Sequence, residues 1–268
     1  MISSHQFLQL SDRYKAYLNS LKITDPVVQE HIDFKVQHTY RVISNIEIIA
    51  RETGLSEADV QLAKTIALVH DIGRYEQFMI YHTFDDRESV NHAELGVRII
   101  GDIDIFKDVV GEDDRKLIVQ AVMNHNIPGL DPENDETVLL FSRLIRDADK
   151  VDILKILSMR DVVFKILETE SREIAYEVPE RFTDCFRHNR IIRSGAVSMN
   201  DYRLLRLSWI YDMNFPATFR LISKHNYASK IMSKIPASEK KEEIAGIILQ
   251  YIETHCDETS HQSLMSNG

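Results

Sequence analysis

The chain contains little glycine and proline, with only 9 Gly and 6 Pro among its 268 residues. Tight turns depend on these residues, so the composition disfavours a fold built from many short strands. Apolar residues nevertheless make up 44% of the chain, which is ordinary for a protein that buries a core. A helical globular protein is therefore favoured.

Long apolar runs are absent as well. No stretch reaches the about 18 uninterrupted apolar residues of a membrane span, and residues 1–6 form neither a basic nor an apolar leader. Cysteine is scarce, and Cys185 and Cys256 lie far apart, outside any Cys-x-x-Cys pattern. We expect a cytoplasmic protein without a membrane segment, in which both thiols are unpaired.

The chain has a deficit of basic residues. Its 32 Lys and Arg are outnumbered by 42 Asp and Glu, which gives a formal net charge of −10. A net acidic protein repels the phosphate backbone, so long nucleic acid is disfavoured as a partner. Net charge does not exclude binding through a local basic patch.

Helical periodicity dominates the sequence. Asp25 and Pro26 form a typical helix start, and so does Ser56 with acidic residues behind it. The predicted helices cover residues 4–19, 26–53, 56 to about 73, a segment from about 90, 112–125, 136–168, 199–212, 216–235 and 238–255. Residues 173–196 are less regular, and the polar residues from 256 onward are expected to be disordered. The pattern predicts an all-α bundle with a C-terminal helical extension.

Several histidines fall at informative positions of these helices. His38 continues an apolar stripe, and His70 lies on a face of small residues with Asp71 directly behind it. His92 begins one helix and His125 ends another. Buried imidazoles and carboxylates are costly unless they are paired or bind a metal. A shared metal would satisfy several of them at once, whereas each one alone also fits a hydrogen-bonded core residue.

The clearest motifs are ALVHDIGR, which contains His70 and Asp71, and DADKVD, which contains Asp149. Together with His38, which precedes them, they resemble the metal signature of the HD superfamily of phosphohydrolases. The resemblance covers about residues 30–155. It implies an HD-type helical domain, with a metal core over about 25–170 and the extension over about 171–256 of a single domain, residues 1–268.

The resemblance also implies a ligand set. His38, His70, Asp71 and Asp149 would hold a metal, with Asp147 as the competitor of Asp149. The two further histidines, His92 and His125, resemble those of the six-ligand HD proteins, in which the Asp of the doublet bridges two ions. They can equally bind a substrate phosphate or only donate hydrogen bonds. The His-His-Glu and Gly-Tyr-Pro strings of the cyclic-dinucleotide phosphodiesterases are absent, which disfavours that substrate.

Four cationic or titratable side chains are further candidates for the site. Arg74 and Lys150 are neighbours of proposed ligands in the sequence and can neutralise a phosphate, as catalytic or substrate-binding groups, or form surface ion pairs instead. His82 can line the cleft as a substrate-binding residue, and so can Arg87 in the same polar segment, which equally fits an ordinary loop.

The resemblance implies a metal-dependent hydrolase acting on a small phosphorylated substrate or nucleotide, with Asp71 as the central catalytic residue. Nitrogen and oxygen ligands without thiolate favour one or two ions of Mn, Fe, Ni, Co or Zn over Mg. Two alternatives remain. One is a di-iron HD-type oxygenase, and the other is a degenerate HD module used for ligand sensing. The oligomeric state is left open.

Overall fold

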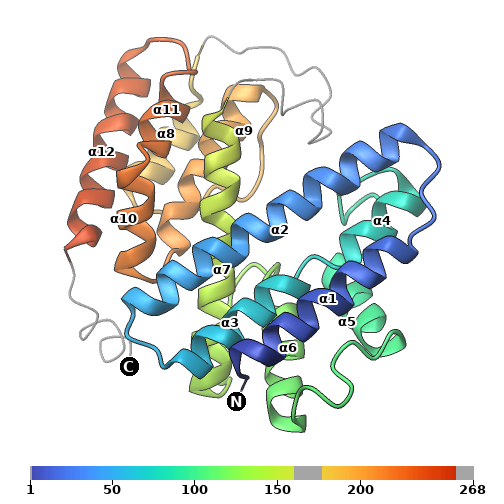
Figure 1. The fold of residues 1–268 in the computed structure, drawn as a ribbon. Coiled ribbons are helices and arrows are strands. Elements are labelled where there is room, and N and C mark those ends of the chain that lie inside the picture. Colours follow the sequence, from blue (N-terminus) through green and yellow to red (C-terminus); the bar gives the residue numbers. More distant parts are fainter. Residues whose placement is uncertain (1, 160–176, 258–268) are drawn as a thin grey trace. The chain divides into compact units, whose positions relative to one another are not determined.

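A computed structural model describes residues 2–159 and 177–257 of the chain. All regular structure in these ranges is helical (Figure 1), which confirms the all-α prediction. Within them, none of the helices combines the length and the apolar character that a membrane crossing requires. The chain divides into two compact units, Met1–Asp149 and Lys150–Gly268.

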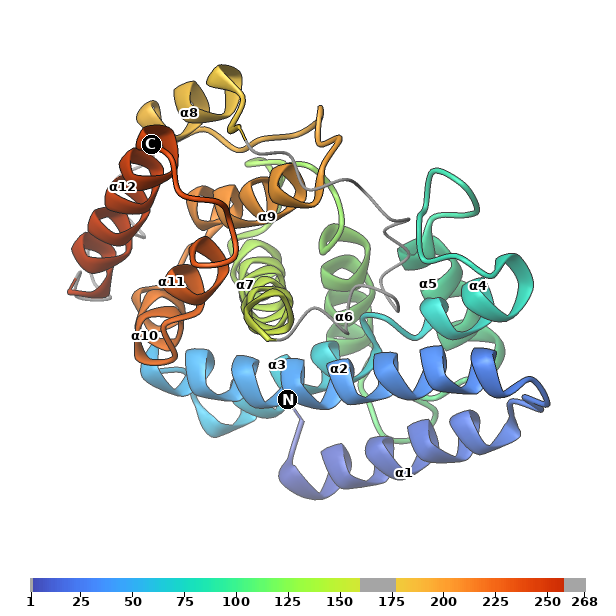
Figure 2. The same ribbon diagram turned by 90° about the horizontal axis from the view of Figure 1, so that it is seen from above.

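The first unit packs around a central helix. Helix α3 contacts α1, α2 and α6, and α4 contacts both α2 and α5. The long helix α2 is easily followed in Figures 1 and 2. The helices are α1 (Ser4–Ser20), α2 (Pro26–Glu52), α3 (Glu57–Val69), α4 (Gly73–Tyr81), α5 (His92–Asp102), α6 (Glu112–Asn124) and the first part of α7 (Glu136–Ser158).

The predicted helix starts are confirmed. The Asp25 side chain accepts a hydrogen bond from the backbone N–H of Val27 at 2.8 Å, directly before α2. The Ser56 hydroxyl accepts one from the N–H of Asp59 at 3.2 Å, before α3. These caps satisfy N–H groups that a helix leaves without an internal partner. They therefore fix where α2 and α3 begin.

The third predicted helix ends earlier than expected. Helix α3 stops at Val69, not near Gly73, and α4 starts at Gly73 as a separate helix. A Cβ on Gly73 would lie 2.2 Å from the carbonyl oxygen of His92 and 2.6 Å from the nitrogen of Gly96, so only glycine allows this approach of α4 to α5. The break places His70 and Asp71 in a connection between two helices.

Helix α7 ends at Ser158 and not at residue 168. The predicted part over residues 160–168 lies outside the described residues. In the first unit, α7 is tied to α2 by a hydrogen bond from Asn45 Nδ2 to the carbonyl of Ala148 at 3.1 Å. It is also tied to α6 by one from Asn124 Nδ2 to Ser142 Oγ at 3.1 Å.

The second unit contains shorter helices than the sequence predicts. The predicted helix 216–235 is divided because Asn226 adopts a left-handed backbone with φ of 54°, which asparagine tolerates. The less regular region contains helix α8, and Cys185 and Cys256 are unpaired, as expected. The elements are α8 (Glu180–Arg187), α9 (Met199–Leu207), the 3₁₀-helix η2 (Ser208–Asp212), α10 (Pro216–Lys224), α11 (Tyr227–Met232) and α12 (Glu239–Cys256). The predicted disorder of the last residues falls on 258–268, outside the described residues.

Candidate metal centre

Six side chains from several helices and from the α3–α4 connection converge within the first unit. His38 comes from α2 and Asp149 from α7, and the adjacent pair His70 and Asp71 follows α3. The remaining two are His92 at the start of α5 and His125 just after α6. They form two groups of three residues. Within each group, the ligand atoms lie within 4.8 Å of one another. The structure thus brings together all six residues that the sequence suggested as ligands.

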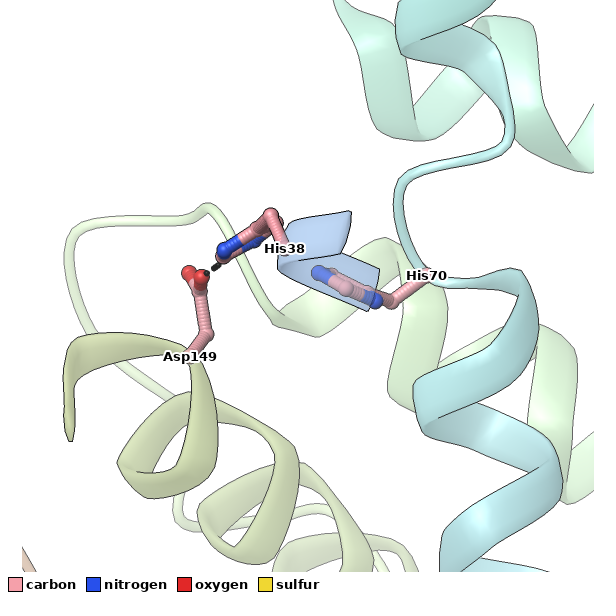
Figure 3. A group of neighbouring side chains, drawn as sticks. All are labelled: His38, His70 and Asp149. Carbon is pink, nitrogen blue, oxygen red and sulfur yellow. Dashed lines mark ion pairs between the residues drawn. The ribbon is translucent and has the colours of Figure 1, made fainter. Parts of the chain in front are cut away.

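The first group consists of His38, His70 and Asp149 (Figure 3). The Nε2 atom of His38 lies 3.1 Å from Asp149 Oδ1, and this contact is drawn as the dashed line in Figure 3. The centroid of the His38 ring is 5.6 Å from that of His70. Both histidines are almost fully buried, while one fifth of the Asp149 side chain is exposed. One carboxylate and two imidazoles thus share one small space.

The second group consists of Asp71, His92 and His125, all of which are buried. The Nε2 atoms of the two histidines are only 2.9 Å apart. Their rings meet edge to face, with centroids 4.9 Å apart. Asp71 Oδ1 lies 3.4 Å from His92 Nε2 and 3.8 Å from His125 Nε2.

Asp71 lies between the two groups. While its Oδ1 faces His92 and His125, its Oδ2 lies 3.5 Å from His38 Nε2 and 3.6 Å from His70 Nε2. Each oxygen of this single carboxylate therefore faces the imidazole nitrogens of one group. This is the arrangement that a bridging ligand requires.

The protonation of His70 fits a metal ligand. Its Nδ1 lies 2.8 Å from the carbonyl oxygen of Ala67, which can only accept, so Nδ1 carries the proton. In the neutral ring, Nε2 then presents a lone pair, and this buried atom has no hydrogen-bond donor among the described residues. Burial lowers the pKa of His70 to about 4 and keeps the ring neutral. A buried lone pair of this kind suits a metal ion.

His92 and His125 give a second, independent indication. Nδ1 of His92 donates to Asp86 Oδ2 at 2.7 Å, and Nδ1 of His125 donates to the carbonyl of Val122 at 2.6 Å. The two Nε2 atoms therefore face each other across 2.9 Å, and both are turned away from the Nδ1 partners. A metal ion that accepts both Nε2 lone pairs fits this contact, as does a single proton shared between the two rings.

The carboxylates of the site are held in their charged form. Burial acts to raise the pKa of Asp71, but the Lys35 ammonium and the nearby imidazoles outweigh it and hold that pKa well below its usual range. Burial likewise acts against ionisation of Asp149, and the hydrogen bond with His38 outweighs it and lowers the pKa. Both groups are thus anionic at neutral pH, as metal binding requires.

The sequence did not identify Asp86, which organises the second group. Its Oδ1 accepts hydrogen bonds from Arg74 Nη1 at 2.7 Å and from Gln77 Nε2 at 2.9 Å. Its Oδ2 accepts from His92 Nδ1 and, at 3.3 Å, from Asn126 Nδ2. A carboxylate on the far nitrogen of an imidazole fixes the ring and raises its basicity. Asp86 lies in a polar loop, where no periodic pattern distinguishes it.

Arg146 of α7 is a second supporting residue that the sequence did not suggest. Its Nη1 donates to the carbonyl oxygens of Asn124 at 3.1 Å, His125 at 3.4 Å and Ile127 at 2.6 Å. The Asn124 carbonyl closes α6, where a helix carries partial negative charge, and the other two carbonyls lie just beyond its end. Arg146 therefore fixes the backbone that carries His125.

Lys35 is the third such residue, because its Nζ lies 2.7 Å from Asp71 Oδ2. It precedes His38 by three positions on α2, so the two side chains share a helix face. This spacing is the signal that could have identified it.

The other predicted residues are placed as follows. Arg74 Nε lies 3.5 Å from Asp71 Oδ1, next to the second group. Lys150 belongs to the second unit, where it forms an ion pair with Asp212. His82 is exposed at the end of α4, and Arg87 is exposed and paired with Asp85. The roles of Arg74, Lys150 and His82 towards a substrate stay predictions.

The comparison with protein families agrees with this geometry. The family model for the HD domain matches residues 36–154, which include all six converging residues. This part of the chain is therefore similar to the HD domain, the domain of a superfamily of metal-dependent hydrolases, which confirms the resemblance inferred from the motifs. No curated protein and no solved structure gave a significant match.

Proposed function

We propose that the protein is a metal-dependent phosphohydrolase with two ions bridged by Asp71. The observation that carries the proposal is the position of Asp71, each of whose carboxylate oxygens faces the Nε2 atoms of one histidine pair. His38, His70 and Asp149 would complete one ion site, and His92 and His125 the other. Asp149 is preferred to Asp147 because its Oδ1 lies beside His38.

The bound ions would supply an activated water and withdraw charge from a phosphoryl oxygen, which suits hydrolysis of a phosphate ester. The chain's own residues prepare this chemistry. Ala67, Asp86 and Val122 fix three imidazoles so that their Nε2 lone pairs face the site. Arg74 places a positive charge beside Asp71. The absence of a thiolate among the six ligands favours Mn, Fe, Ni, Co or Zn.

The substrate we propose is a small phosphomonoester, phosphodiester or nucleotide. His82 and Lys150 remain candidate contacts to it, Lys150 also as a catalytic group. Two unpaired cysteines are compatible with the reducing cytoplasm, which we propose as the compartment.

Elemental analysis followed by an activity panel tests the proposed function. We expect about two divalent ions per chain and, after removal by a chelator, loss of phosphoesterase activity that added Mn, Co, Ni, Fe or Zn restores. The panel contains p-nitrophenyl phosphate, its bis ester, mono- and triphosphate nucleotides and cyclic nucleotides. A protein that purifies without metal, and neither binds added ions nor hydrolyses any of these esters, would contradict the proposal and support a sensing module.

Asp86→Asn is expected to weaken metal binding at the second group only. Without the carboxylate, His92 loses the partner that orients it and raises its basicity, a change that typically costs about 10- to 100-fold in metal affinity. Metal titration should show one site unchanged and one site weakened by this factor. Asp85→Asn is the matched control, since Asp85 lies in the same loop but pairs with Arg87. Equal affinities in wild type and Asp86→Asn would refute this role.

The same ligand set keeps a di-iron oxygenase as the second candidate. Four imidazoles and two carboxylates without a thiolate are compatible with iron as well as with zinc or manganese. Anaerobic purification followed by electron paramagnetic resonance separates the two functions. A mixed-valent di-iron signal that disappears on turnover with oxygen would favour the oxygenase, whereas a hydrolase needs no redox-active pair.

A further inference from the structure

Among the described residues, Lys35 is the cation in closest contact with Asp71, the carboxylate between the two groups of ligands. Its Nζ lies 2.7 Å from Asp71 Oδ2, and only 14% of its side chain is exposed. The same Nζ lies over the ring of Phe84, 5.4 Å from its centroid. Phe84 in turn packs on Phe78, with ring centroids 4.6 Å apart. The ammonium is thus held at the site by a carboxylate and an aromatic face.

These contacts do not use all of the N–H donors of Lys35. An ammonium group has three N–H donors, of which Asp71 takes one, and an aromatic face attracts the charge without requiring a particular N–H. The Nη1 of Arg74, by comparison, is engaged by the Gln77 side chain, the Phe84 carbonyl and Asp86, while its Nε makes no hydrogen bond within the described residues. Lys35 therefore retains donors that it can offer to a ligand.

Charge balance indicates what that ligand is. Asp71 Oδ2 is the oxygen that faces His38 and His70. Under the proposed function it therefore binds the first ion, the one that these two histidines hold together with Asp149. A divalent cation and the Lys35 ammonium would then share one carboxylate oxygen, and two like charges so close together repel in a buried site. An anion that contacts both of them removes this repulsion.

We infer that Lys35 binds the anionic group of the substrate, a phosphoryl group, from the side of the first ion. This assignment rests on the proposed function and deepens it. Lys35 would donate to a phosphoryl oxygen, which Lys typically binds as a point charge. It replaces none of the ligands and is a substrate-binding residue that the sequence motifs do not mark.

The test measures binding of inorganic phosphate to the metal-loaded protein by calorimetry, together with metal content. Lys35→Met keeps much of the length and apolar volume of the side chain and removes its charge. We expect it to retain the wild-type metal content and to bind phosphate about 10- to 100-fold more weakly, the effect of losing a hydrogen bond to a charged group. Lys35→Arg keeps the charge and should stay within a few-fold of wild type.

Lys64→Met is the matched control. Lys64 has the same side-chain exposure of 14%, pairs with Glu47 at 3.0 Å and lies over the Phe7 ring at 4.7 Å, but contacts none of the six ligands by these interactions. Its substitution should leave phosphate affinity unchanged, and thermal melts of both methionine variants show whether they fold. Equal phosphate affinity in wild type and Lys35→Met, or loss of metal from a folded Lys35→Met, would overturn the assignment. A wild-type protein that binds no metal would overturn the proposed function itself.

Discussion

Asp71→Ala is expected to abolish turnover and to reduce metal binding at both groups, because the two oxygens of Asp71 face the histidines of both groups. Loss of the ions removes several kcal/mol of transition-state stabilisation, which corresponds to a fall of about a thousandfold or more in kcat/KM. Elemental analysis and the phosphoester panel measure the two effects. Circular dichroism should show nearly unchanged helicity, because Asp71 lies in a connection between helices.

The pattern of metal loss distinguishes a bridging carboxylate from an ordinary ligand. Asp149→Ala should weaken the first group and spare the second, while His92→Ala should do the reverse. Asp85→Ala, at a carboxylate that pairs with Arg87, should change neither. If Asp71→Ala retained one fully occupied site, the bridging role would be wrong even if activity were lost. If it retained both metal and activity, the proposed centre would be wrong altogether.

The helix starts could be predicted from sequence because their signals are local. Asp25 with Pro26, and Ser56 with the acidic residues behind it, act through hydrogen bonds to N–H groups two or three residues away. The end of α3 could not be predicted in the same way. It depends on the approach of Gly73 to the backbone of α5, a contact between segments that the sequence does not show as neighbours.

The candidate ligands could be suggested from sequence for a related reason. His38, His70, Asp71, His92, His125 and Asp149 are unusual at their helix positions or belong to short motifs. The residues that orient these ligands have neither an unusual helix position nor a motif. Asp86 lies in a polar loop, and the guanidinium of Arg146 reaches carbonyl oxygens that are more than fifteen positions away in the chain. Only the folded arrangement shows that these side chains serve the site.

The electrostatics of the site also required the structure. The sequence suggested Arg74 and Lys150 as the cations because both are neighbours of proposed ligands. In the structure, Arg74 is engaged by Asp86 and by the Phe84 carbonyl, and Lys150 by Asp212. Lys35 instead contacts the shared carboxylate directly. Sequence proximity to a ligand therefore identified one cation beside Asp71, Arg74, but missed Lys35, whose contact with Asp71 spans 36 positions of the chain.

Gly73→Ala is expected to cause the largest loss of stability of the single substitutions considered. The added Cβ would meet the His92 carbonyl oxygen at 2.2 Å and the Gly96 nitrogen at 2.6 Å, and both are backbone atoms that cannot rotate away. Helices α4 and α5 must therefore separate, which we expect to cost about 3 kcal/mol or more. Chemical denaturation measures this loss. Because His92 begins α5, metal affinity at the second group should fall with it.

Gly101→Ala is the matched control, since Gly101 lies in α5, the helix that Gly73 approaches, and its Cβ would meet nothing within 4 Å. Alanine favours a helix over glycine by up to about 1 kcal/mol, so this variant should be as stable as wild type or slightly more so. Its metal content should not change. If Gly73→Ala unfolded at the same denaturant concentration as Gly101→Ala, α4 would tolerate a side chain at its start. The close approach of α4 and α5 would then not be what sets Asp71 beside His92.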